Sequence, residues 1–97
     1  MAEIVWTEEA QQWLKDIFEY IAADNPSAAI NTVAGTYERA QLLLEFPEIG
    51  HRYLDSDRDV RILLYGHYRL AYLLKDNRDV SILGVFHGSL DIKKYQL

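Results

Sequence analysis

The chain has 97 residues, no cysteine and a net charge of −5 at neutral pH. We expect residues 1–97 to form a single domain, since this length is enough to bury one core. The absence of cysteine excludes disulfides, thiolate zinc sites and cysteine nucleophiles, which suits a cytoplasmic protein. No apolar run approaches the roughly 20 residues of a membrane span, and the first residues lack the pattern of a signal peptide.

The charge is divided unevenly along the chain. Residues 1–50 carry two basic and nine acidic residues, a net charge of −7, whereas residues 51–97 carry eight basic and six acidic residues, a net charge of +2. Phosphate contacts supply most of the non-specific affinity for nucleic acids. We therefore expect no direct sequence-specific DNA binding and no membrane contact, although a local basic patch in the second half is compatible with the composition.

The first half predicts one short strand and two helices. Residues Glu3–Thr7 are β-branched and aromatic, as is typical of a strand, and Thr7 is suited to cap a helix that ends near Asp24. Asn25-Pro26 stops this helix and starts a second one, which runs to about Glu45. Each helix carries one apolar stripe at helical spacing, so the two should form a hairpin.

The second half predicts an antiparallel meander of three strands. Its segments are a loop (Glu48–Arg58), a strand (Asp59–Tyr65), a two-residue turn (Gly66-His67), a strand up to Lys75, a turn (Asp76–Asp79) and a strand (Val80–His87). The middle strand alternates strictly between its two sides. One side carries Tyr68, Leu70, Tyr72 and Leu74, and the other carries Arg69, Ala71, Leu73 and Lys75.

The order β-α-α-β-β-β predicts a two-layer α+β fold, with the N-terminal helical hairpin packed on one face of an antiparallel sheet. The pattern does not place the first strand within that sheet. Gly35 lies inside the second helix, where it indicates a close approach of the other helix or of the sheet. The uncovered sheet face is a candidate partner site, because we expect it to carry the apolar residues Leu63, Ala71, Leu73, Leu83 and Val85.

No metal or cofactor is expected. Asp55, Asp57 and Asp59 are spaced as at the start of a calcium loop, but Val60 replaces the required glycine and Gly66 the closing glutamate. We interpret this segment as a solvated loop. The three histidines are too far apart for a local zinc motif; they are His51, His67 and His87.

Four cationic or titratable side chains are expected on one face of the sheet if the alternation holds: Arg61, Arg69, Lys75 and His87. Such a group is suited to hold a phosphate or an acidic partner helix. His87 ends the last strand immediately before Gly88 and has two interpretations. It is either a strand-end residue that packs beside a turn, or a contact or general acid–base residue at the edge of the sheet.

Five segments, in their order along the chain, match a pattern shared by a known family. They are Glu8-Glu9-Ala10 after the first strand, residues 17–22 with Asp24-Asn25-Pro26, residues 44–50, residues 66–72 and residues 85–91. With these segments the chain resembles the RelE/ParE superfamily of toxins from bacterial toxin–antitoxin modules over nearly its whole length. The resemblance implies the same β-α-α-β-β-β fold and an antitoxin segment that wraps around the toxin.

The resemblance also implies a choice between two branches. RelE-like members cleave mRNA in the ribosome with basic residues on the sheet and a C-terminal aromatic residue, whereas ParE-like members inhibit DNA gyrase. Arg69 matches an arginine that both branches share. The ending His87–Asp91 resembles the ParE-like branch and lacks the basic cluster of the RNA-cleaving pattern. We therefore expect a ParE-like toxin that inhibits DNA gyrase and growth and is neutralised by a cognate antitoxin.

Two alternatives stay open. In a ribosome-dependent mRNA endonuclease, Arg69 would stabilise charge on the phosphate, His87 would move protons, and Tyr95 would be the late aromatic residue. A degenerate member would bind its antitoxin without being toxic. In the ParE-like reading, the residues expected to contact partners are Arg61, Leu63, Arg69, Leu73, Lys75, Leu83, Val85, His87 and Asp91.

Overall fold

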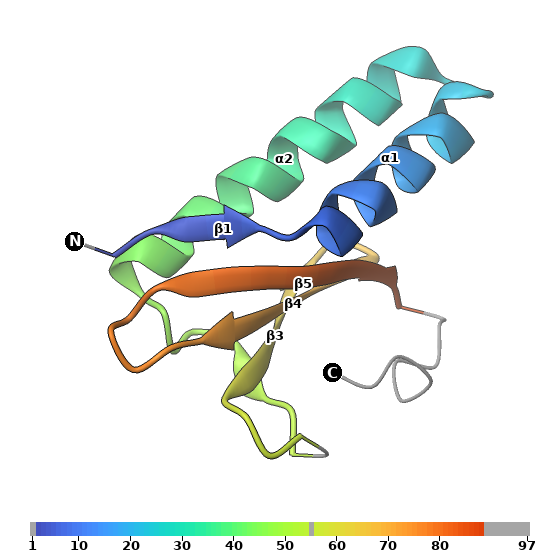
Figure 1. Cartoon of the computed structure of the whole chain (residues 1–97). Coiled ribbons are helices and arrows are strands. Elements are labelled where there is room, and N and C mark those ends of the chain that lie inside the picture. The colour runs from blue at the N-terminus through green and yellow to red at the C-terminus, as the bar shows by residue number, and fades with distance from the viewer. Residues whose placement is uncertain (1, 55, 89–97) are drawn as a thin grey trace.

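The computed structural model describes residues 2–54 and 56–88. It is a two-layer α+β fold in which a helical hairpin lies on one face of a five-stranded sheet (Figure 1). The elements are β1 (Ile4–Trp6), α1 (Glu8–Ala22), α2 (Pro26–Glu45), β2 (His51–Arg52), β3 (Val60–Tyr65), β4 (Tyr68–Leu74) and β5 (Val80–His87). The predicted fold class is confirmed, with one strand more than the sequence indicated.

The strand order is β1-β5-β4-β3-β2, and β1–β5 is the only parallel pair of the described sheet. The first strand thus lies at one edge, beside the last one. The interpretation of Glu48–Arg58 as loop throughout was wrong, because His51 and Arg52 pair with β3. A two-residue strand with both side chains exposed has no apolar alternation by which a sequence could reveal it.

Local hydrogen bonds fix the start of each helix. The Thr7 hydroxyl oxygen accepts the Ala10 N–H (3.1 Å) and donates to the Ile82 carbonyl oxygen of β5 (2.7 Å). The Asn25 side chain accepts the Ala28 N–H (3.1 Å), and Pro26 occupies the first turn of α2. The predicted helix starts are therefore confirmed.

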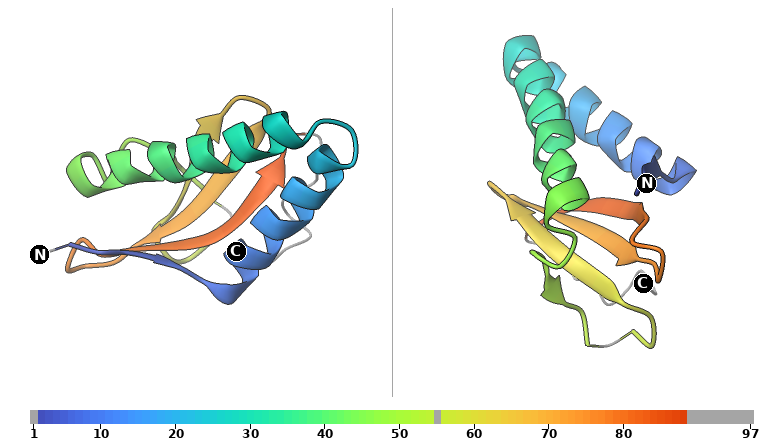
Figure 2. Two further views of the ribbon diagram at one scale, coloured as in Figure 1. Left: turned by 90° about the horizontal axis from the view of Figure 1, so that it is seen from above. Right: turned by 90° about the vertical axis from the view of Figure 1, so that its left-hand side faces the viewer.

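The main core lies between the helical hairpin and the sheet. Figure 2 shows the hairpin over one sheet face, with its connecting turn projecting beyond the strands. Helix residues Leu14, Ala40 and Leu43 pack against strand residues that include Leu70, Tyr72 and Ile82. Gly35 is a point of close approach, since a Cβ there would overlap the Tyr65 hydroxyl. The predicted contact at Gly35 is confirmed, and the sheet supplies it.

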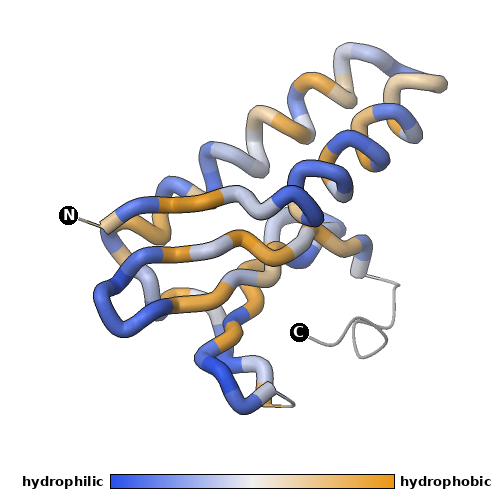
Figure 3. Tube along the Cα trace, viewed as in Figure 1, coloured by the Kyte–Doolittle hydropathy of each residue, from blue (hydrophilic) through white to orange (hydrophobic). Residues whose placement is uncertain are grey.

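A smaller cluster lies on the opposite sheet face, around Ile62, Ala71 and Phe86. Trp13 of α1 contributes an edge-on contact with Phe86, with ring centroids 4.7 Å apart. Its other members are Tyr53 and Leu83, both partly buried. Figure 3 shows how hydrophobic segments recur along the strands while the β4–β5 turn is hydrophilic.

Leu63 and Val85 were assigned to the wrong face of the sheet. Both are buried in the core against the helices, where Leu70 pairs with Leu63 on one side and with Val85 on the other. The two-residue turn explains the placement of Leu63, because it sets Tyr65 opposite Tyr68 and therefore Leu63 opposite Leu70. Neither of the two described helices combines the length and the hydropathy that a membrane-spanning segment requires.

Candidate functional site

A hollow of about 470 Å³ lies where the β3–β4 turn meets the end of β5. Its lining residues are Leu64, Gly66, His67, Tyr68, Arg69, His87 and Gly88. We call it the sheet-end hollow. None of these side chains is acidic, although the chain as a whole has a charge of −5.

Backbone geometry sets the shape of this hollow. Gly66 has a φ of 57°, in the left-handed region that favours glycine, and this allows the tight turn between β3 and β4. The Gly88 N–H then donates to the His67 carbonyl oxygen (2.7 Å), which carries the β4–β5 pairing one step beyond His87. The turn and the end of β5 are thereby held together.

One arginine and two histidines meet in the sheet-end hollow. Arg69 donates to the Gly88 carbonyl oxygen (3.1 Å), which fixes the direction of its guanidinium. The His87 ring meets the Tyr68 ring edge-on at 5.6 Å and lies nearly parallel to the His67 ring at 6.3 Å. With no carboxylate among the described residues that line it, this arrangement favours an anionic group on a partner.

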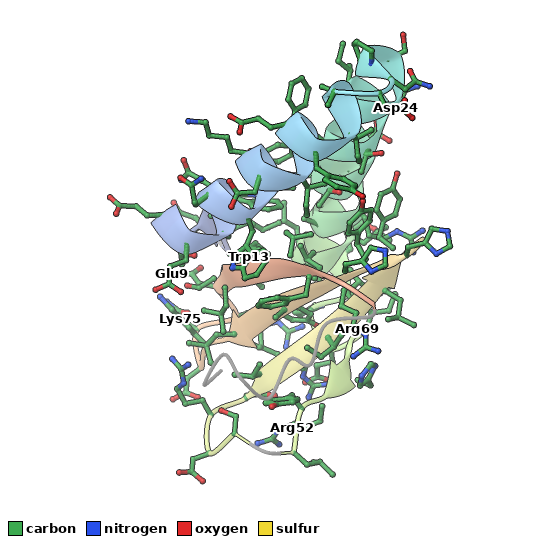
Figure 4. The ribbon with its side chains drawn as sticks, turned by 90° about the vertical axis from the view of Figure 1, so that its right-hand side faces the viewer. Glu9, Trp13, Asp24, Arg52, Arg69 and Lys75 are labelled. Atoms are coloured by element: carbon green, nitrogen blue, oxygen red, sulfur yellow. The ribbon has the colours of Figure 1, made fainter. Side chains whose placement is uncertain are left out.

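The expectation that Arg61, Arg69, Lys75 and His87 share one face is wrong. Arg61 lies opposite Tyr72, on the face that packs against the helices, whereas Arg69 lies opposite Leu64 and Phe86. Figure 4 places Lys75 and Arg69 at opposite ends of the sheet. Arg69 and His87 lie on opposite faces of the sheet. The sheet-end hollow includes both because it lies at the ends of the strands, where side chains from the two faces can meet.

Arg61 has a structural environment instead. Its Nε donates to Asp59 (3.0 Å), and its Nη1 donates to the carbonyl oxygens of Glu48 (3.1 Å) and Gly50 (3.2 Å). Asp59 also forms an ion pair with Arg52 at 3.4 Å. Arg61 therefore ties the chain that precedes β2 to the sheet.

The other predicted site residues do not line the sheet-end hollow. Leu63 and Val85 are core residues, Leu73 and Leu83 are half-buried, and Asp91 and Tyr95 lie outside the described residues. His67 was interpreted only as a turn residue. The two-residue turn is the sequence signal that places it beside the end of the last strand.

No metal site is visible in residues 2–54 and 56–88, where no three histidine, aspartate or glutamate side chains converge. Of the three aspartates spaced as in a calcium loop, Asp55 lies outside the described residues and Asp59 is paired with arginines.

Comparisons with known proteins define the family. Residues 4–92 match the family model described as "ParE toxin of type II toxin-antitoxin system, parDE". The fold is similar to a chain of the chromosomal ParDE system from P. aeruginosa, with a TM-score of 0.75 and 20% identity, covering 90% of this chain and 96% of that one.

A second solved structure, the RelBE2 toxin–antitoxin complex from Mycobacterium tuberculosis, is more distant. It has a TM-score of 0.51 and 23% identity, over 89% of this chain and 96% of that one. No curated protein sequence matches this chain. At these identities the two structures establish the fold, whereas the family model covers nearly the whole sequence. The chain therefore belongs to the ParE toxin family of type II toxin–antitoxin systems.

Proposed function

We propose that this protein is the toxin of a type II module, that it acts in the cytoplasm by inhibiting DNA gyrase, and that a cognate antitoxin neutralises it. The observation that carries the proposal is the family match over residues 4–92. The two similar structures come from toxin–antitoxin systems, ParDE and RelBE2, which supports an antitoxin as one partner. The sheet-end hollow supplies a surface for the target, with Arg69, His67 and His87 as contact residues.

The positions of the basic residues favour a binding protein over a ribosome-dependent mRNA endonuclease. An RNA-cleaving site needs several cationic groups around one phosphate, to stabilise charge and to move protons. Here Arg61 is bonded to Asp59 and to two backbone carbonyls, and Lys75 is at the far end of the sheet (Figure 4). Arg69 and the two histidines are suited to bind an acidic surface without a reaction.

The test is supercoiling of relaxed circular DNA by purified gyrase, with the folded full chain added at increasing concentration. We expect loss of supercoiling together with trapped, cleaved DNA. Activity unaffected by folded, antitoxin-free protein would overturn gyrase as the target, and mRNA cleavage in a translating extract would then identify the ribosome. Co-expression with the product of the neighbouring small gene tests the antitoxin separately, since we expect a stable complex.

A further inference from the structure

The corner where α2 ends carries a second hollow, of about 460 Å³, which the proposed function does not use. Its lining residues are Glu45, Phe46, Pro47, Glu48, Ile49 and Arg78. We call it the α2 corner. It lies at the opposite end of β4 from Arg69, because Arg69 is near the start of that strand and Arg78 is in the turn between β4 and β5. Phe46 and Ile49 are 55% and 50% exposed, so two large apolar side chains lie at the surface within this hollow.

The backbone beneath these two side chains is held firmly. The buried Tyr72 hydroxyl donates to the Pro47 carbonyl oxygen (2.7 Å) and accepts the Gly50 N–H (3.0 Å). Arg61 donates to the carbonyl oxygens of Glu48 and Gly50 from the same side. The exposure of Phe46 and Ile49 is thus built into the fold, and a partner would bind a surface that needs little ordering.

The rim of the α2 corner carries charges of both signs. Glu45, Glu48 and Arg78 line it, and none of the three forms an ion pair with another described residue. Arg78 also has a φ of 70°, in the left-handed region where glycine or asparagine is more readily accommodated. The backbone conformation of the turn therefore does not explain why position 78 is an arginine, which indicates a role for the arginine side chain.

We propose that the α2 corner is the contact of a weak symmetric homodimer. Phe46 and Ile49 of the two copies pack together, and Arg78 of each copy pairs with Glu45 and Glu48 of the other. A twofold contact requires a surface complementary to itself, and an apolar centre flanked by both charge signs meets that condition. A partner of a single charge sign would leave one side of this rim unmatched. The patch is small, so the dimer is expected to dissociate on dilution.

Sedimentation equilibrium of the full chain tests the proposal. The average mass should rise with concentration from 11.3 kDa toward twice that value. Phe46→Ser, Arg78→Glu and the double variant Glu45→Arg/Glu48→Arg should each weaken association at least about tenfold. Combining Arg78→Glu with Glu45→Arg/Glu48→Arg should restore it, because the charges are then exchanged. Glu38→Arg is the matched control, since Glu38 is exposed on the same helix and does not line the hollow.

Arg78→Gly separates a contact role from a turn role. Glycine accommodates the left-handed backbone, so the thermal unfolding temperature should be unchanged or higher, while the dissociation constant rises at least threefold. Lower thermal stability with unchanged association would make Arg78 a turn residue and overturn the proposal. A chain that stays monomeric up to about 1 mM would also overturn it, as would a charge-exchanged triple variant that fails to associate. None of these outcomes depends on the toxin's target.

Discussion

At the scale of single residues, Tyr72 has the most demanding environment. It is fully buried in β4, and its hydroxyl joins the sheet to the α2 corner through Pro47 and Gly50. Burial raises the pKa of this hydroxyl above its ordinary value of 10.0, although the Gly50 hydrogen bond and the nearby Arg61 act in the opposite direction. The sequence indicated that Tyr72 faces the helices but not that its hydroxyl bonds to residues more than twenty positions away.

Tyr72→Phe should destabilise the fold by roughly 1–3 kcal/mol at pH 8, because a buried carbonyl and a buried N–H lose their partner. The raised pKa adds a dependence on pH. Above pH 10 the Tyr72 phenol ionises more readily in the unfolded chain than in the folded one, so the free energy of unfolding of the native protein falls. The variant has no phenol at this position and does not undergo this loss. Urea unfolding at pH 8 to 11 should show the difference between the two proteins narrowing above pH 10. A constant difference would contradict this environment, since the two proteins differ only by the Tyr72 hydroxyl.

Gly35 of α2 and Tyr65 of β3 form a close contact between helix and sheet. A methyl group at position 35 would occupy the place of the Tyr65 hydroxyl, while Arg39 lies over the Tyr65 ring, 5.5 Å from its centroid. We expect Gly35→Ala to destabilise the protein by about 1–3 kcal/mol through overpacking, despite the better helix propensity of alanine. The sequence predicted that something approaches Gly35 closely, but helix periodicity cannot say which strand residue does so.

A double-mutant cycle in urea tests this contact. Tyr65→Leu removes the clashing ring end, so Gly35→Ala should be neutral or stabilising in that background. Ala34→Gly is the control, because Ala34 is an exposed neighbour on the same helix and should respond only through propensity. Equal effects of Gly35→Ala with and without Tyr65 would show that the two residues are not coupled.

At the scale of elements, the helices were predictable and the sheet faces were not. Thr7, Asn25 and Pro26 are strong local signals for the helix starts, and periodicity supplied the lengths. The faces of the strands depend on register, which one turn and one irregularity control. The two-residue turn at Gly66-His67 sets Leu63 opposite Leu70, and the register of β4 on β5 shifts between Ala71 and Tyr72. No local sequence pattern predicts that shift in register.

The two helix caps should differ in their contribution to stability. Thr7 caps α1 and also donates to Ile82 of β5, whereas the exposed Asn25 caps α2 alone. We expect Thr7→Ala to cost about 2 kcal/mol and Asn25→Ala about 1 kcal/mol or less. Equilibrium unfolding of the two variants gives the comparison directly. An equal or larger loss for Asn25→Ala would mean that the bond to β5 contributes nothing measurable.

At the scale of the whole molecule, charge is separated between the two layers. Residues 1–50, which include both helices, carry a net charge of −7, while the described residues that line the sheet-end hollow include an arginine and two histidines and no acidic residue. The sequence indicated this division and singled out Arg69 and His87. It could not indicate that Arg61 and Lys75 lie elsewhere or that His67 joins them, because those positions follow from strand register and from where the strands end.

The separation of charge leads to a prediction about the toxin's target. Arg69→Gln should raise the concentration needed for gyrase inhibition by about tenfold or more, as expected for an arginine that anchors an interface. Stability should change by less than about 1 kcal/mol, because the bond that Arg69 makes to Gly88 is exposed.

Arg58→Gln is the matched control, since Arg58 is exposed and lies outside the hollow. The measurement is supercoiling inhibition by the folded variants at equal concentration, with circular dichroism as the check on folding. If Arg69→Gln and Arg58→Gln inhibit gyrase equally well, gyrase binds a surface other than the sheet-end hollow. Gyrase would then still be the target. If only Arg69→Gln is impaired, the contact lies where the β3–β4 turn meets the end of β5. His67→Gln and His87→Gln would then show whether the two imidazoles share it.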